Sequence, residues 1–161
     1  VNNAGIAGVK ERILSKQGYE SMFATNYLGH FLLTRLLEKV LSDAGSVANP
    51  ARVVHVASDS QYVWKLVGNE TVVANVKKIV PPLASNPHDA LLNYGISKAL
   101  NIMLAKEQQR RLGATSSVVA VALHPGIVGI DLFADGGDVG PGAIFADLLC
   151  SFAHKSWQQG A

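Results

Sequence analysis

Short runs of β-branched residues alternate with long helical segments in this chain, and this alternation limits how it can fold. Residues 52–57 and 117–123 are short, valine-rich runs of the kind that form buried strands. Apolar side chains recur at three- and four-residue spacing in residues 17–42, while residues 94–112 end in a basic turn and a glycine, and both patterns predict helices. Residues 1–7 indicate a strand end that runs into a turn. We therefore expect an α/β fold, part of a doubly wound parallel sheet with helices on both faces.

The remaining segments are less regular. Residues 58–93 mix polar and apolar side chains with three prolines, so we expect an irregular excursion with a short helix near residues 72–79. Residues 135–142 contain four glycines and a proline, which predicts a loop, and helical sequence follows it. No internal repeat divides the chain, and its length suits a single partial domain over residues 1–161.

The composition excludes several functional classes. A hydrophobic fraction of 48% and a charged fraction of 16% indicate a globular chain. The formal net charge is +2 and the basic residues are scattered, so we expect no nucleic-acid partner. Cys150 is the single cysteine, which excludes an internal disulfide, and no cysteine and histidine spacing suggests a metal site. No apolar run reaches the ~18 residues that a membrane-spanning helix needs.

Tyr94 and Lys98 are the first candidates for chemistry. They are four residues apart on a predicted helix, so both side chains project from one face. A phenol has a reference pKa of about 10. A neighbouring ammonium would lower the Tyr94 pKa, which suits proton exchange with an alcohol or carbonyl oxygen. The same spacing also occurs by chance, as an exposed tyrosine beside a solvated lysine.

The position of Ser58 in the sequence supports a functional role for Tyr94 and Lys98. Ligands of parallel α/β sheets bind beyond the carboxyl ends of the strands, and Ser58 follows such an end, as do residues 2–5 and 124–126. The Ser58 hydroxyl could bind the oxygen that Tyr94 protonates, or it could simply cap a turn. Its neighbours Ala57 and Asp59 do not form the Gly-x-Ser-x-Gly elbow of a serine nucleophile, so we exclude a hydrolase of that kind.

Asn26 is unusual because it lies within an apolar helix. Asparagine is a poor helix former, and Gly29, a second one, is close by. We expect a local kink here and a water molecule that bridges toward Lys98 and opens a proton path to solvent. The alternative is a polar side chain on the exposed side of the helix.

In this order, the motifs resemble those of the short-chain dehydrogenase/reductase family. Asn2-Asn3-Ala4-Gly5 comes first and is followed by Asn26, Ser58, Tyr94-x-x-x-Lys98 and Pro125-Gly126. The resemblance covers essentially the whole chain, and residues 23–34 and 124–126 are similar to the retinol dehydrogenase-like branch. It implies a Rossmann-like fold and an oxidoreductase that interconverts an alcohol and a carbonyl by hydride transfer with NADP or NAD.

The resemblance also implies a role for each matching residue. Asn26, Ser58, Tyr94 and Lys98 match the catalytic tetrad of the family, with Tyr94 as the acid/base. The cofactor would be contacted by Asn3, Ala4, Gly5, Tyr94, Lys98, Pro125, Gly126 and Val128. Two positions depart from the pattern: Ala57 replaces a serine, and Ile130 replaces the threonine or serine that holds the carboxamide. The substrate would be a small, apolar alcohol or carbonyl compound.

The glycine-rich dinucleotide fingerprint of the family has no counterpart in these residues. Because the chain starts at a strand end, we expect a fragment that lacks the first βαβ units, with any targeting signal, and the last strand and helix. Such a fragment would fold poorly alone and bind cofactor weakly, so its own activity is in doubt.

Two functional interpretations stay open. The intact tetrad favours an enzyme, whereas the missing cofactor half favours an inactive truncated or regulatory protein that retains the fold. The sequence does not determine whether the cofactor is NAD or NADP, nor does it determine the substrate, membrane association or the oligomeric state. A homo-oligomer is compatible with it. The cytoplasm is the default location.

Overall fold

The computed structural model describes residues 1–62, 74, 76–77 and 88–126. Of the short helix predicted near residues 72–79, the three described residues are helical. The predictions for residues 135–142, Val128, Ile130 and Cys150 lie outside the described residues.

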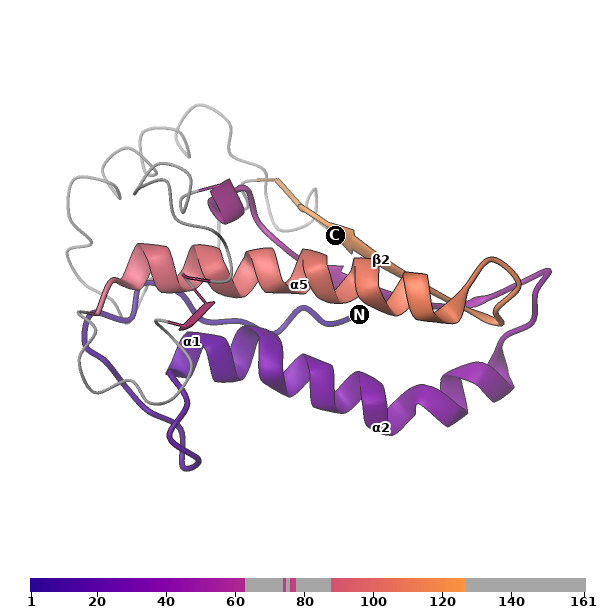
Figure 1. The fold of residues 1–161 in the computed structure, drawn as a ribbon, viewed down its shortest axis with the longest axis horizontal. Coiled ribbons are helices and arrows are strands. Elements are labelled where there is room, and N and C mark those ends of the chain that lie inside the picture. The colour runs from indigo at the N-terminus through magenta and orange to yellow at the C-terminus, as the bar shows by residue number, and fades with distance from the viewer. Residues whose placement is uncertain (63–73, 75, 78–87, 127–161) are drawn as a thin grey trace.

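Three segments of the chain run in parallel. β1 (Ala51–Val56) pairs with β2 (Val118–Leu123), with Val56 opposite Leu123. On the other edge of β1, the Asn2 N–H donates to the Val54 carbonyl at 2.7 Å, and the Val56 N–H donates to the Asn2 carbonyl at 3.1 Å. Figure 1 shows the N-terminal segment lying alongside β1. The predicted α/β class and the parallel sheet are confirmed, and the carboxyl ends of the three segments lie at one edge.

One long helical segment connects the N-terminal segment to β1. It consists of α1 (Ser21–Phe23), a π-helical turn η1 (Ala24–Leu28) and α2 (Gly29–Ala44). It begins later than the predicted residue 17 because Glu20 caps it. The Glu20 carboxylate accepts the N–H groups of Met22 and Phe23 at 3.1 and 2.8 Å, which satisfies donors that the first turn leaves free.

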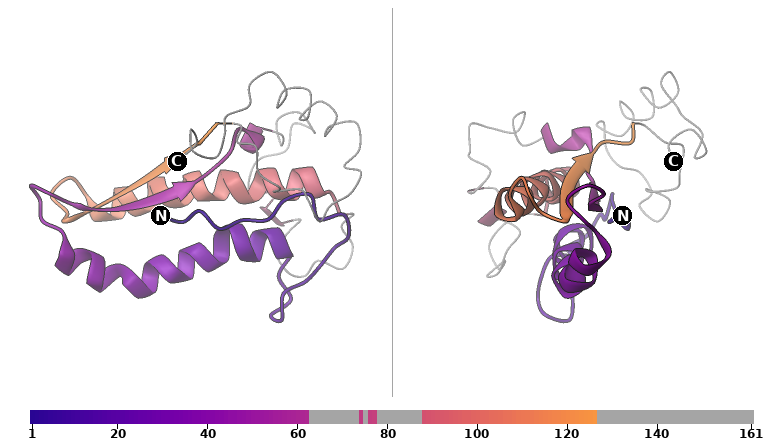
Figure 2. Two further views of the ribbon diagram at one scale, coloured as in Figure 1. Left: turned by 180° about the vertical axis from the view of Figure 1, so that it is seen from behind. Right: turned by 90° about the vertical axis from the view of Figure 1, so that its right-hand side faces the viewer.

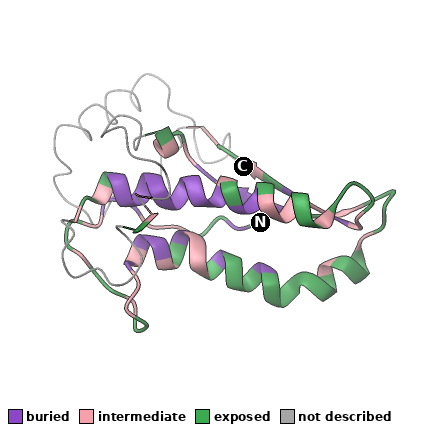
Figure 3. Cartoon of the chain, viewed as in Figure 1, coloured by how far each residue is buried: buried purple, intermediate pink, exposed green. Residues whose placement is uncertain are grey.

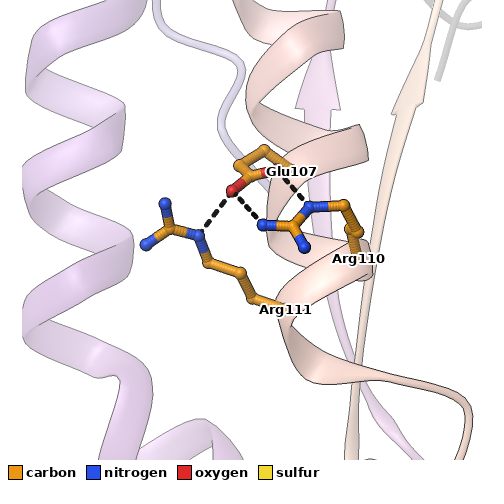
Figure 4. A network of polar contacts seen from close by, with 3 residues as sticks. All are labelled: Glu107, Arg110 and Arg111. Atoms are coloured by element: carbon orange, nitrogen blue, oxygen red, sulfur yellow. Dashed lines mark hydrogen bonds and ion pairs between the residues drawn. The ribbon is translucent and has the colours of Figure 1, made fainter.

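The second long helix, α5 (Ala90–Leu112), connects the two strands. It begins four residues before the predicted Tyr94, because the Asp89 carboxylate accepts the Leu92 N–H at 2.9 Å. It ends at Gly113, whose φ of 75° lies in the left-handed region that favours glycine, as its sequence predicted. At this end Glu107 pairs with Arg110 and Arg111 at 2.7 and 2.6 Å on the exposed surface (Figure 4).

Both helices cover the same face of the sheet. Val53, Val118 and Ala120 form a buried cluster against Leu41 of α2 and Leu112 of α5. The side chains that alternate with these along the strands are partly or fully exposed, so in the described part of the chain one sheet face is buried. Figure 2 shows the two helices running along the strands.

The two helices differ in how deeply they are buried. The first half of α5 is almost entirely buried, whereas α2 buries two residues, His30 and Thr34 (Figure 3). Much of the exposed surface of α2 is apolar, and Leu36 is 71% exposed. Exposed apolar side chains gathered on one helix favour association with another protein surface. Within the described residues, no helix is long and apolar enough to cross a membrane.

A buried polar cluster joins the N-terminal segment, α2, β1 and α5. The Asn2 amide donates to Thr34 Oγ1 at 2.9 Å and lies 3.2 Å from His55 Nδ1. His55 Nε2 lies 2.8 Å from Gln108 Oε1. Since the Gln108 oxygen accepts, Nε2 carries the His55 proton and Nδ1 accepts from Asn2. The cluster is therefore satisfied by a neutral His55.

Acidification should destabilise the fold through this cluster. Burial lowers the pKa of His55 below its usual 6.5, although the Gln108 hydrogen bond raises it in part. Neutral His55 therefore contributes its full stability to the fold above about pH 6.5, which is the pKa of histidine in the unfolded chain. This stability is lost as the pH falls through the lower pKa that His55 has in the folded chain. We expect the melting temperature to drop by several degrees from neutral pH to pH ~5. His55→Gln should reduce that drop, and an equal drop in both proteins would show that His55 is not its source.

Candidate active site

Tyr94 and Lys98 lie in the first turns of α5 and are both buried, with 7% and 4% exposure. Lys98 Nζ lies 5.5 Å from the centroid of the Tyr94 ring and donates a hydrogen bond to the Val56 carbonyl at 3.1 Å. The ring packs against Ala7 and Met22. The alternative of an exposed tyrosine beside a solvated lysine is therefore wrong for this pair.

The pKa of Tyr94 differs from the sequence-based expectation. Burial raises it above the usual 10, and a hydrogen bond with the Ser58 side chain lowers it by less. The predicted lowering by Lys98 is wrong for the chain as described. The reason is desolvation, which disfavours both the phenolate and the ammonium and lowers the pKa of Lys98 as well. The pair is thus held as a neutral phenol beside a buried amine.

Ser58 follows β1 and precedes the 3-10 turn η2 (Asp59–Tyr62). Its hydroxyl accepts the Ser60 N–H and donates to Ser60 Oγ, both at 3.2 Å, while its carbonyl accepts the Gln61 N–H. Ser58 therefore does cap a turn. Its side chain is also close enough to Tyr94 to lower the pKa of that phenol.

Asn26 is fully buried in the π-helical turn η1, which is where the sequence predicted a kink. Its amide oxygen accepts the Ile6 N–H at 2.9 Å, and its amide nitrogen donates to the Ile6 carbonyl and to Ser97 Oγ, both at 3.0 Å. The alternative of an exposed polar side chain is wrong. Asn26 instead connects the N-terminal segment to α5.

Ser97 is a site residue that the sequence analysis missed. It is fully buried, accepts from Asn26 and donates to the Tyr94 carbonyl at 2.7 Å. It therefore links Asn26 to the helical turn that carries Tyr94 and Lys98. A small polar residue directly before Lys98, on a helix that buries most of its first half, was the available signal.

The first segment expected to contact the cofactor lies next to these residues. Asn3 and Ala4 are exposed and Gly5 is partly buried. A Cβ atom on Gly5 would lie 3.3 Å from the Asn26 amide oxygen and 3.5 Å from Lys98 Nζ. The missing side chain thus lets the main chain at Gly5 approach the Asn26 amide and the Lys98 amine closely. The Lys98 amine and the exposed main chain of Asn3 and Ala4 are polar groups of the kind that orients a bound cofactor, so these residues fit a dinucleotide.

The other predicted cofactor segment follows β2. Pro125 and Gly126 are partly buried, and Gly126 has a φ of 87°, a conformation that favours glycine. Next to them, His124 Nε2 lies 3.2 Å from a carboxylate oxygen of Asp59. This confirms that the segments after β1 and β2 meet at one edge. A recess of about 210 Å³ opens there, lined by Ala57, Gln61, Ile102, Ala122, Leu123 and His124.

Comparison with known proteins agrees with this arrangement. No family model matches the chain. Human polyprenol dehydrogenase is 37% identical over 134 residues, which cover 83% of the chain. A short-chain dehydrogenase/reductase of Armillaria gallica is 34% identical over 131 residues, and mouse retinol dehydrogenase 12 is 34% identical over 128. The chain is a relative of the short-chain dehydrogenases/reductases. This confirms the resemblance, including its retinol dehydrogenase-like branch.

Solved structures support the same conclusion for the fold. An uncharacterized protein of Mycobacterium paratuberculosis is 30% identical and superposes with a TM-score of 0.58 over 86% of the chain. A Burkholderia xenovorans structure, provisionally assigned to the short-chain dehydrogenases/reductases, has a TM-score of 0.52 at 18% identity. The chain spans only 35% to 40% of the length of the three curated relatives named above.

Proposed function

We propose that the protein that carries this chain is an NAD(P)-dependent oxidoreductase that interconverts an alcohol and a carbonyl compound, and that residues 1–161 form the catalytic part of a Rossmann-like domain. The observation that carries the proposal is the burial of Tyr94, Lys98 and Asn26 in one place, against the main chain at Gly5. Buried titratable groups with shifted pKa values are typical of active sites.

Each residue has a distinct task in this proposal. Tyr94 donates its phenolic proton to the substrate oxygen in the reductive direction and takes it back in the oxidative one. Ser58 donates a hydrogen bond to the same oxygen and orients it. The Lys98 amine binds the nicotinamide ribose and stabilises the phenolate that proton transfer leaves behind. When it is bound, the nicotinamide cofactor supplies or accepts the hydride.

The proposal also assigns the residues that would contact the cofactor. Its adenosine side would be lined by Asn3, Ala4 and Gly5, and its nicotinamide would pack beside Pro125, Gly126 and Val128. We expect the substrate to be apolar, in agreement with the polyprenol and retinol in the names of two relatives. Asn26 would complete a proton path from Lys98 through a bound water molecule.

Ser58→Ala tests this assignment, using the complete protein that contains the chain. We expect kcat for carbonyl reduction to fall about 100-fold, since one donor to the reacting oxygen is lost. The consumption of NADPH or NADH with retinal-like and polyprenal-like aldehydes would measure it. Ser60→Ala is the matched control, because it removes the neighbouring hydroxyl and leaves the reacting oxygen untouched. Equal kcat in both variants would contradict the role of Ser58.

A further inference from the structure

His30 is the one buried histidine of α2, and its ring is only 7% exposed. Its Nδ1 atom lies 2.9 Å from the main-chain carbonyl oxygen of Asn26. A carbonyl oxygen only accepts hydrogen bonds, so Nδ1 must carry the proton. The contact therefore fixes the neutral tautomer of His30, in which Nε2 carries no proton.

This hydrogen bond sits directly after an irregular turn of the helix. In the π turn, the Gly29 N–H donates to the Ala24 carbonyl five residues back, instead of the usual four. Single π turns change the pairing of nearby carbonyl groups and are frequent at functional sites. The His30 side chain supplies a donor to one of these carbonyls, so it holds the main chain of the turn in place.

Asn26 is thus fixed from both ends. Its side chain is bound by Ile6 and Ser97, and its carbonyl is bound by His30. The groups whose charge acts on His30 come from separate elements: Lys98 from α5, His55 from β1 and the amino group at Val1. Lys98 is close enough for its charge to lower the pKa of His30, although desolvation is the larger cause.

We propose that His30 is a positioning residue for the proton path of this site. It holds the Asn26 carbonyl in the π turn, and the side chain of the same Asn26 lies against Gly5 together with the Lys98 amine, where the path from Tyr94 through Lys98 reaches the turn. The inference rests on the proposed function and deepens it. An apolar side chain of similar size would fill the same space but would leave the Asn26 carbonyl without this donor.

Three variants separate positioning from packing, again in the complete protein. His30→Leu removes the donor, and we expect kcat to fall about 10- to 100-fold with KM nearly unchanged, since small displacements of a catalytic group have effects of that size. His30→Asn should restore most of kcat, because its amide nitrogen can take the position of Nδ1. His30→Gln is the matched control, since its amide nitrogen lies further out, near the position of Nε2, and should not restore kcat.

The dependence of kcat on pH and on D₂O gives a second readout that packing alone would not move. We expect His30→Leu to increase the solvent isotope effect, because proton transfer becomes slower than the other steps. Nitrogen NMR of labelled histidine should show the proton of His30 on Nδ1. A proton on Nε2, or a kcat in His30→Leu equal to that of the unaltered protein, would overturn the inference.

Loss of kcat in all three variants in proportion to loss of folded protein would also overturn it, since His30 would then be purely structural. Failure of the proposed function is a different result. In that case the unaltered protein would turn over no alcohol or carbonyl compound with either cofactor, and this inference would fall with it. Normal turnover in the unaltered protein together with normal turnover in His30→Leu would count against His30 alone.

Discussion

Replacing Tyr94 by phenylalanine should abolish the turnover of carbonyl substrates, with a loss of at least about 1,000-fold in kcat. The phenol is the acidic group that the site can bring to a substrate oxygen, and phenylalanine has no proton to give. The Tyr94 ring packs between Ala7 and Met22, and phenylalanine preserves those contacts. The loss should therefore come from chemistry and not from misfolding.

Cofactor binding separates this outcome from a damaged site. Lys98 and the main chain at Gly5 remain in Tyr94→Phe, so the dissociation constant for NADPH or NADH should change little. Fluorescence titration of the cofactor would measure it. Tyr19→Phe is a suitable control, because Tyr19 is a partly buried tyrosine in a different cluster. Unaltered turnover in Tyr94→Phe would contradict the assignment of Tyr94 as the acid/base.

Local sequence patterns predicted the strands and the end of α5 well. The valine-rich runs give β1 and β2 almost residue for residue, because few other structures accept such short apolar runs. Gly113 marks the end of α5 because its left-handed conformation excludes most other residues. The helix starts were misplaced because Glu20 and Asp89 act as caps through their side chains, and an acidic residue also occurs at many positions that are not caps.

The sequence predicted that the candidate site residues would lie together, but it did not predict their electrostatics. The order of Asn26, Ser58, Tyr94 and Lys98 could be recognised along the chain, and the structure places Ser58 and Lys98 near Tyr94. The sign of the Tyr94 pKa shift depends on how completely the fold removes water, which a spacing of four residues does not encode. His30 was missed for the same reason, since its donor role depends on the π turn.

Lys98→Met should make the chain more stable while it removes activity. Lys98 is 4% exposed, and within the described residues its amine donates one hydrogen bond to the Val56 carbonyl and faces the Tyr94 ring. A buried charge without an anionic partner is costly, and methionine fills nearly the same volume without it. We expect the free energy of unfolding to increase on the order of 1 kcal/mol, as is common when a functional group is replaced for stability.

The stability gained in Lys98→Met should depend on pH in a definite direction. Burial lowers the pKa of Lys98 below its usual 10.5, so the unfolded chain binds the proton more tightly than the folded one. Burial of the protonated Lys98 amine destabilises the fold most at pH values below the pKa of folded Lys98. This destabilisation disappears as the pH rises from that pKa to the pKa of Lys98 in the unfolded chain. The stability difference between Lys98→Met and the unaltered chain should therefore shrink toward alkaline pH.

Urea unfolding at several pH values would measure this difference. Lys106→Met is the matched control, because Lys106 lies on the same helix but is exposed, and its replacement should change stability little at any pH. A destabilised Lys98→Met would mean that the hydrogen bond to Val56 and the contact with Tyr94 outweigh the desolvation of the amine. The expected result instead identifies Lys98 as a residue that destabilises the fold and is placed there for its chemistry.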